Sequence, residues 1–191
     1  MRGRYLFHVA RPILSALSGA LRILPRPFAR ALWSCIDGMH GRIAVGIRYV
    51  IARRLAQHVG DNVYFSPYVE IRNWENLRIG SNVSIHRSCY IEALGGVTIG
   101  SDVSIAHGTS IISFEHTWQD ETCAIKDNPL QLQEVVIDDD VWIGCAVRIL
   151  SGVHVRRRTI VAAGAVVTQS HEGHQVLAGI PAKPVKQLSV K

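Results

Sequence analysis

The sequence predicts an all-β protein whose main domain is a parallel β-helix of about five triangular coils, preceded by an N-terminal helical segment. Three observations support this prediction. An Ile, Val or Phe recurs every six residues over most of the chain, each shift of phase follows three hexads, and the first 58 residues show helical spacing instead. The length of 191 residues and the hydrophobic content of 48% suit one domain with a sizeable core, and they exclude a disordered or collagen-like chain.

Residues 1–58 form a basic arm. They contain ten arginines, no lysine and one acidic residue (Asp37), so their formal charge is +9, whereas residues 59–191 carry −3. Arginines and prolines interrupt every apolar run before the ~18 residues that a membrane-spanning helix needs. The apolar residues instead follow two amphipathic helical stripes. The first comprises Ile13, Leu17, Leu21 and Leu24, and the second Ile43, Ile47, Val50 or Ile51, and Leu55.

Two interpretations of this arm stay open. A basic amphipathic helix can lie on an anionic membrane surface, or its apolar stripe can pack on the body or on a neighbouring subunit. No nucleic-acid-binding motif accompanies the charge, so we expect no nucleic-acid partner. The four cysteines form no CxxC pair, and the opening residues do not form a clear secretory signal. We therefore expect free thiols and a cytoplasmic location, with peripheral contact at the inner face of the cytoplasmic membrane as an option.

The body is a repeat with a period of six. All fifteen hexads begin with Ile, Val or Phe, at positions 59, 65, 71, 79, 85, 91, 99, 105, 111, 137, 143, 149, 155, 161 and 167. A helix with 3.6 residues per turn cannot keep one residue in six on the same side for so long. Short β segments joined by equivalent corners can, with the first residue of each hexad pointing inward. Three hexads make one coil, so fifteen make five coils of a prism roughly 24 Å tall.

Three motifs show which known family this repeat resembles. The runs Ile99-Gly-Ser-Asp-Val-Ser104 and Val141-Trp-Ile-Gly144 and the ending Gly179-Ile-Pro-Ala-Lys183 resemble the hexapeptide-repeat acyltransferases. Within that family the chain is most similar to the maltose, galactoside and nodulation-factor acetyltransferases and the capsule or exopolysaccharide O-acetyltransferases. The resemblance covers about residues 59–188. It implies a left-handed parallel β-helix, a homotrimer, and acetyl-CoA in the groove between neighbouring prisms.

The repeat and the motifs divide the chain into three parts. Residues 1–58 are the arm, residues 59–178 the β-helix acyltransferase domain, and residues 179–191 a C-terminal tail with the Gly-x-Pro-Ala-Lys motif. The longest departure from the repeat is the inserted loop at residues 114–134. A long loop on a rigid solenoid is a place where functional residues concentrate.

The inserted loop carries the candidate catalytic residue, His116. Transfer of an acetyl group from a thioester to a hydroxyl needs a base that accepts the hydroxyl proton, and histidine exchanges protons near neutral pH. His116 lies just beyond the hexad that begins at Ile111, where the similar acetyltransferases carry their catalytic histidine. We expect His116 to act as the general base in a direct attack on acetyl-CoA, without an acyl-enzyme.

The resemblance also implies a set of cofactor-binding residues. Backbone amides at the corners of the prism can bind the pantetheine amides and polarise the thioester carbonyl, and lysines suit the anionic nucleotide end. The family pattern places acetyl-CoA against Trp142, Gly144, Cys145, Ala163, Thr168, Gly179, Lys183 and Lys186. Two positions depart from the pattern, because family members usually carry Ser or a similar small residue at Cys145 and often Lys at Gln169.

The acceptor site is expected around His86 and Glu92. His86 matches a position where the sugar acetyltransferases keep a polar residue, usually Asn, and Glu92 begins the insertion on the same coil. We expect a saccharide hydroxyl as the acceptor, in surface polysaccharide biosynthesis, with N-acetylation of an amino sugar as the alternative. His86, His107 and His116 could instead form the zinc site of a γ-class carbonic anhydrase. The sequence has Ile105-Ala-His107 where that class has Ile-Gly-His, so we expect no metal.

Overall fold

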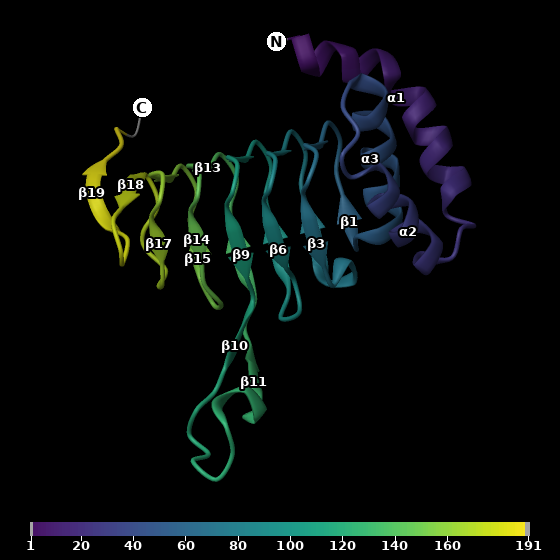
Figure 1. The fold of residues 1–191 in the computed structure, drawn as a ribbon. Helices are drawn as coiled ribbons and strands as arrows, with labels where there is room; N and C mark the ends of the chain where they lie inside the picture. The colour runs from purple at the N-terminus through teal and green to yellow at the C-terminus, as the bar shows by residue number, and fades with distance from the viewer. Residues whose placement is uncertain (1, 190–191) are drawn as a thin grey trace.

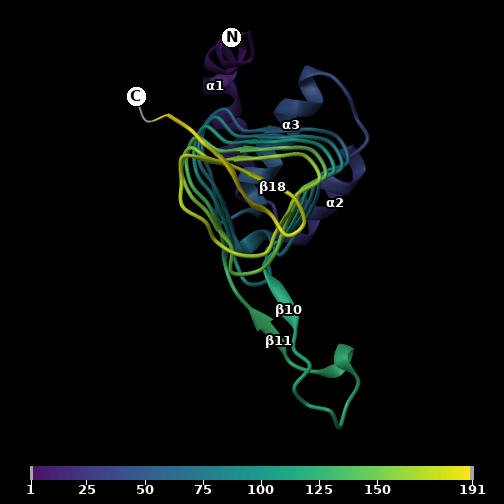
Figure 2. The ribbon, with the colours of Figure 1, turned by 90° about the vertical axis from the view of Figure 1, so that its left-hand side faces the viewer.

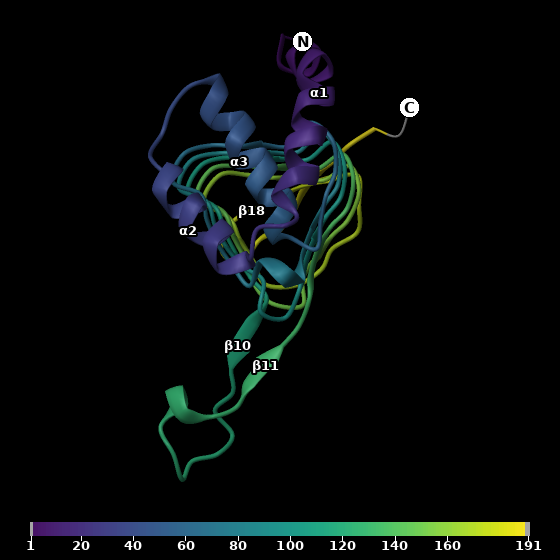
Figure 3. The same ribbon diagram turned by 90° about the vertical axis from the view of Figure 1, so that its right-hand side faces the viewer.

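The computed structural model describes residues 2–189 and consists of a helical segment that covers one end of a triangular β-prism (Figures 1 and 3). The helices are α1 (Arg2–Leu21), α2 (Arg26–Ile36) and α3 (Arg42–Leu55). Among the described residues, no helix combines the length and the apolar character needed to cross a bilayer.

The prism has three parallel sheets, one on each side (Figure 2). The first sheet contains β1 (His58–Val59), β4 (Leu77–Ile79), β7 (Val97–Ile99), β12 (Val135–Ile137) and β15 (His154–Val155). The second contains β2 (Tyr64–Phe65), β5 (Ser84–Ile85), β8 (Ser104–Ile105), β13 (Trp142–Ile143), β16 (Ile160–Val161), β18 (Gln175–Ala178) and the antiparallel β19 (Lys183–Gln187). The third contains β3 (Glu70–Arg72), β6 (Tyr90–Glu92), β9 (Ser110–Ile112), β14 (Arg148–Ile149) and β17 (Val166–Val167).

The predicted β-helix and its N-terminal helical segment are confirmed. The first residues of all fifteen hexads are buried and stack in register, as Ile85 does on Ile105 and Ile105 on Ile143. Five complete coils are followed by part of a sixth, because β18 pairs with β16 and His171 forms a bridge with Val155. The dominant core is therefore a column of Ile and Val side chains inside the prism.

The corners repeat as regularly as the strands. Edge 1/2, between the first and second sheets, places a non-glycine residue with positive φ on each coil, at Asn62, Asn82, Asp102, Asp140 and Arg158. Asn and Asp tolerate this left-handed conformation better than other residues. Neighbouring coils also bond there, since Asn62 Nδ2 donates to Asn82 Oδ1 at 3.0 Å and Arg158 pairs with Asp140 at 2.8 Å.

Only part of each predicted stripe packs against the core. In the first stripe, Ile13 and Leu17 are 66% and 52% exposed, whereas Leu21 packs against the core. Ser18 is buried, where it donates to the Leu14 carbonyl at 2.7 Å. The helix was therefore predicted correctly from its spacing, and its packed face in part.

Arg48 fastens α3 to the prism. The side chain is 1% exposed and donates to the carbonyl oxygens of Phe65 (2.9 Å), Ile36 (3.1 Å) and Met39 (2.9 Å). It thereby joins α3, the end of α2 and the first coil. Burial lowers the pKa of Arg48, and the nearby Tyr64 and Asp37 oppose this shift.

A two-stranded hairpin departs from this regular body. The strands β10 (Phe114–His116) and β11 (Leu130–Leu132) pair antiparallel and project away from the third coil (Figures 1 and 2). Two short 3₁₀ helices lie outside the sheets, η1 (Trp74–Asn76) after β3 and η2 (Ile125–Asp127) in the loop of the hairpin.

Candidate active site

The hairpin that carries His116 is anchored at its root by Ser113. This side chain is fully buried, donates to the Glu92 carbonyl at 2.8 Å and accepts from the Gly95 amide at 2.9 Å. The Gln133 amide closes the root by donating to the Ser113 carbonyl at 3.0 Å. A Cβ at Gly95 would collide with this carbonyl oxygen, so only glycine fits there. The direction of the hairpin is thus fixed by the second and third coils.

His116 is the last residue of β10 and is exposed. It lies opposite Leu130 in the hairpin, and its ring packs against the edge of Phe114 with the ring centroids 6.3 Å apart. Among the described residues, none forms a hydrogen bond with its imidazole. Both ring nitrogens are therefore accessible to a substrate or to a second chain.

Four of the eight predicted cofactor residues gather on a different corner, edge 2/3, between the second and third sheets. Gly144 and Cys145 lie there on the fourth coil, Ala163 on the fifth and Gly179 on the partial sixth. Successive coils are joined at this corner, since the Gly164 amide donates to the Cys145 carbonyl at 2.8 Å. Along this edge, the corners of successive coils therefore stack on one another in the direction of the prism axis.

Edge 2/3 offers unused hydrogen-bond donors. Among the described residues, no hydrogen bond uses the backbone N–H of Cys145 or of Ala163. The carbonyl oxygens of Gly144 and Cys145 point instead into bonds with Thr109 (3.1 Å) and Gly164 (2.8 Å). A Cβ at Gly144 would lie 2.6 Å from the Ala163 nitrogen, so glycine keeps the two coils close. Two free N–H groups on adjacent coils suit the amide carbonyls of a pantetheine chain.

Other cofactor candidates extend toward the C-terminal end of the prism. Trp142 is 55% exposed on β13, and Thr168 is exposed just after β17. Lys183 and Lys186 lie on β19, opposite Ala178 and Val176 of β18. Both lysines are exposed, and neither pairs with a described acidic residue. They can meet the phosphates of a nucleotide.

The two acceptor candidates have contrasting surroundings. His86 is exposed at edge 2/3, with its ring 5.9 Å from that of Tyr64. Glu92 is 7% exposed, and its carboxylate accepts hydrogen bonds from Asn73 and, at 3.0 Å, from the Tyr90 hydroxyl. Burial and the Glu92 carboxylate raise the pKa of Tyr90, so the phenol stays a neutral donor. His86 can contact an acceptor directly, whereas Glu92 reaches one only if these bonds rearrange.

A single chain does not bring all of these groups together. His86 and four cofactor candidates (Gly144, Cys145, Ala163 and Gly179) lie on edge 2/3, but the hairpin of His116 leaves from the opposite edge of the third sheet (Figure 2). Thr168, which follows β17, lies at that opposite edge too. His107 also lies on edge 2/3, where its carbonyl accepts from the Ala146 amide at 2.9 Å. Within residues 2–189, no group of three or more His, Cys, Asp and Glu side chains is arranged to hold a metal ion.

Sequence reasoning missed the anchoring role of Ser113 and Gly95. A polar residue directly after the buried strand β9 was the available signal for Ser113, because such a residue needs partners inside the fold. The partner of Ser113 lies 18 residues earlier in the chain, in a turn whose path the repeat does not specify.

Comparison with known proteins finds acetyltransferases that are similar to this chain. No family model matches the sequence. A probable acetyltransferase of Mycobacterium tuberculosis is 32% identical over 143 residues, which are 74% of this chain and 48% of that protein. The galactoside O-acetyltransferase of Escherichia coli is 27% identical over 142 residues, which are 74% of this chain and 69% of that enzyme. The chain thus spans about half the length of the mycobacterial relative.

A solved structure has a similar fold. The hexapeptide-repeat acetyltransferase of Vibrio cholerae, complexed with acetyl-CoA, superposes with a TM-score of 0.73 and 26% identity, covering 94% of this chain and 89% of that one. In sequence and in fold, the chain is therefore similar to hexapeptide-repeat acetyltransferases. Its fold is the left-handed parallel β-helix of these acetyltransferases, and edge 2/3 with the His116 hairpin is its candidate active site.

Proposed function

We propose that this chain is an acetyl-CoA-dependent O-acetyltransferase that acetylates a saccharide hydroxyl. The observation that carries the proposal is the pair of free N–H groups of Cys145 and Ala163 on edge 2/3, in a chain similar to a Vibrio cholerae acetyltransferase that is complexed with acetyl-CoA. The galactoside O-acetyltransferase among the relatives supports a saccharide as the acceptor. The residues present fit acetyl-CoA, since Cys145 and Ala163 offer unused N–H groups on edge 2/3 and the exposed lysines of β19 pair with no described acidic residue.

In the proposed mechanism His116 acts as the general base. Its free imidazole nitrogen takes the proton of the acceptor hydroxyl while the hydroxyl oxygen attacks the thioester carbonyl of acetyl-CoA. A new ester C–O bond forms, the C–S bond breaks, and the sulfur of the departing CoA receives the proton from His116. A backbone N–H on edge 2/3 stabilises the negative charge that develops on the carbonyl oxygen. No acyl-enzyme forms.

The separation of His116 from edge 2/3 supports a homotrimer. The exposed hairpin of one chain is placed to complete the site of a neighbouring chain, with acetyl-CoA in the groove between the two prisms. His86 on edge 2/3 would then contact the acceptor, and Glu92 would contact it or hold Tyr90 and Asn73 in position. We further propose peripheral contact between the helical segment and a membrane, which would keep the enzyme beside acceptors for surface polysaccharides.

A His116→Ala variant tests the proposal. A positioned base contributes roughly 10²–10⁴-fold, so kcat for release of CoA should fall by at least about 100-fold with a galactoside or maltose as acceptor. Binding of acetyl-CoA should be little changed, because the proposed cofactor contacts lie on the prism and His116 acts on the acceptor hydroxyl. His58→Ala is the matched control, since His58 is another exposed histidine, at the start of β1. Full activity of His116→Ala would refute the mechanism. If the unchanged protein acetylated only amino sugars, the chain would be an N-acetyltransferase.

A further inference from the structure

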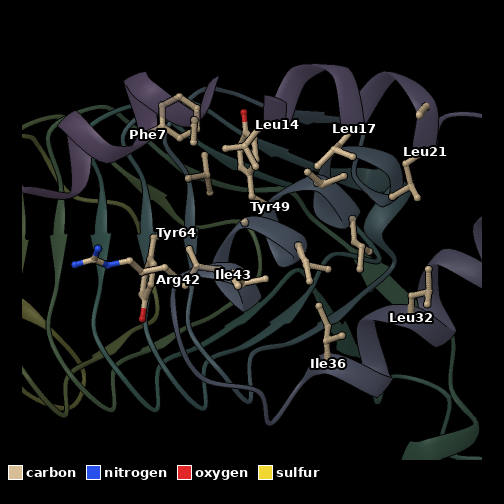
Figure 4. Close-up of a pocket in the computed structure, with 18 of the residues that line it drawn as sticks. Phe7, Leu14, Leu17, Leu21, Leu32, Ile36, Arg42, Ile43, Tyr49 and Tyr64 are labelled. Atoms are coloured by element: carbon tan, nitrogen blue, oxygen red, sulfur yellow. The ribbon is translucent and has the colours of Figure 1, made fainter. Parts of the chain in front are cut away.

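A large apolar groove lies between the helical segment and the first coil (Figure 4). Its volume is about 1290 Å³, and α1, α3, the end of α2 and the first coil line it. Phe7, Leu14 and Leu21 form the α1 side, and Ile43 lies on the α3 side. Nearly all of its lining is aliphatic or aromatic, so water gains few hydrogen bonds there.

Several large apolar side chains are exposed at the rim of this groove. Ile23 is 89% exposed, Ile43 81% and Leu17 52%, and all three line the groove. Contiguous exposed apolar patches mark sites of interaction with proteins, membranes or ligands. The occupant of the groove must therefore present apolar surface.

The positive charge around the groove favours an anionic occupant. Arg42 lines it, and Arg22 and Arg26 flank the lining residues Ile23 to Pro25. All three arginines are exposed, and none pairs with a described acidic residue. A second copy of the same face would bring the +9 charge of its own residues 1–58 against this one, which repels it. A nucleic acid would match the charge but would leave the apolar rim in water.

We infer that this groove is a docking surface for an anionic phospholipid bilayer. The rim residues Leu17, Ile23 and Ile43 enter the boundary between headgroups and acyl chains, and Arg22, Arg26 and Arg42 meet the lipid phosphates. This inference deepens the peripheral membrane contact proposed above, because it names the contacting surface and the lipid class. It does not depend on the acetyl-transfer chemistry.

The position of the groove agrees with such docking. The helices cover one end of the prism and leave its three sides free (Figures 1 and 3). In the proposed homotrimer, prisms packed side by side about a common axis would turn all three helical segments toward the same side. Three grooves would then face one membrane, and the binding of each would strengthen the others through a raised effective concentration.

Sedimentation of the full chain with phospholipid vesicles tests the inference. We expect the chain to bind vesicles that contain about 30% of the anionic lipid phosphatidylglycerol and to bind pure phosphatidylcholine vesicles only weakly. High salt should abolish the binding. Arg42→Gln should weaken partitioning by about fivefold, the share of one arginine near an anionic surface. The double variant Ile43→Ser, Ile47→Ser should weaken it by about tenfold or more. Both isoleucines are exposed, so the fold should persist, and circular dichroism checks this.

The control substitutions lie on the prism, outside the groove. Val185→Ser removes a side chain that is 62% exposed on β19, and Arg156→Gln removes an exposed arginine of the fifth coil. Neither should change vesicle binding. No binding of the full chain to anionic vesicles, or equal losses in variants and controls, would overturn the inference. A change of oligomeric mass in Ile43→Ser, Ile47→Ser without a change in vesicle binding would also overturn it, since the groove would then be a contact between copies.

Discussion

The prism and the helical segment bury their apolar side chains with different regularity. In the prism, the first residue of every hexad is buried, with Ile143 and Ile105 at 0% exposure. In the helical segment, residues on one predicted stripe have opposite fates, since Leu55 is 1% exposed and Ile43 81%. The prism encloses its own core, whereas each helix packs through part of its surface and leaves the rest exposed.

This difference shows where a period determines burial. A coil repeats identical surroundings for each hexad, so the inward direction is set by the repeat alone. A helix has several faces with apolar residues, and the neighbour against which it packs decides which one is buried. The apolar face left outward by α1 and α3 is consistent with a surface that meets another partner.

The largest expected effect tests the prism side of this comparison. Ile143→Ala should lower the free energy of unfolding by about 2–5 kcal/mol, because the cavity lies in a closed column of side chains that cannot collapse. Urea unfolding at fixed protein concentration measures this loss. A loss below about 1 kcal/mol would mean that the column is loosely packed and that burial in the prism stabilises the fold no more than burial in the helical segment.

Arg48→Met tests how firmly the two regions are joined. The variant leaves the carbonyls of Phe65 and Met39 without a donor and that of Ile36 with the Met39 amide alone, so we expect a loss of about 2–3 kcal/mol. The helices should melt before the prism, and hydrogen exchange of α3 should increase while that of the third coil stays slow. Uniform exchange in both regions would show that they unfold as one unit.

Gly95→Ala separates the hairpin from the prism that anchors it. The added Cβ collides with the Ser113 carbonyl and moves the root of the hairpin, so kcat should fall by about 10–100-fold. Gly96→Ala is not a clean control because Gly96 has a positive φ of 98°, so Ala93→Gly on the same turn serves instead. An unchanged kcat in Gly95→Ala would show that His116 does not depend on this root.

The smallest expected effect belongs to the outward helical face. Ile43→Ala should change the free energy of unfolding by no more than about 0.5 kcal/mol, because this side chain is 81% exposed. Ile43→Ala and Ile143→Ala make the same chemical change, so the difference between their losses of stability compares the outward helical face directly with the core of the prism. A loss close to that of Ile143→Ala would show that the groove is filled in the assembled protein.

The sequence allowed prediction of the coils and of the inserted loop that carries His116, because the period fixes the strands and every departure from it marks a loop. That this loop forms a hairpin was not predicted. Three features could not be predicted. The partial sixth coil follows Thr168, where the hexad pattern ends. Arg48 gave no sign of burial, because its three carbonyl partners come from distant turns. The separation of His116 from edge 2/3 follows from the edge at which the hairpin leaves, and a second chain is needed to join them.

Calorimetric titration of the full, assembled protein with acetyl-CoA tests the central claim most directly. The account predicts micromolar binding near one molecule per chain, weakened when Lys183 and Lys186 are both changed to Gln. Elemental analysis of the same sample should find no stoichiometric zinc. No heat of binding at millimolar acetyl-CoA, with about one zinc ion per chain, would contradict the account and make CO₂ hydration the reaction to assay.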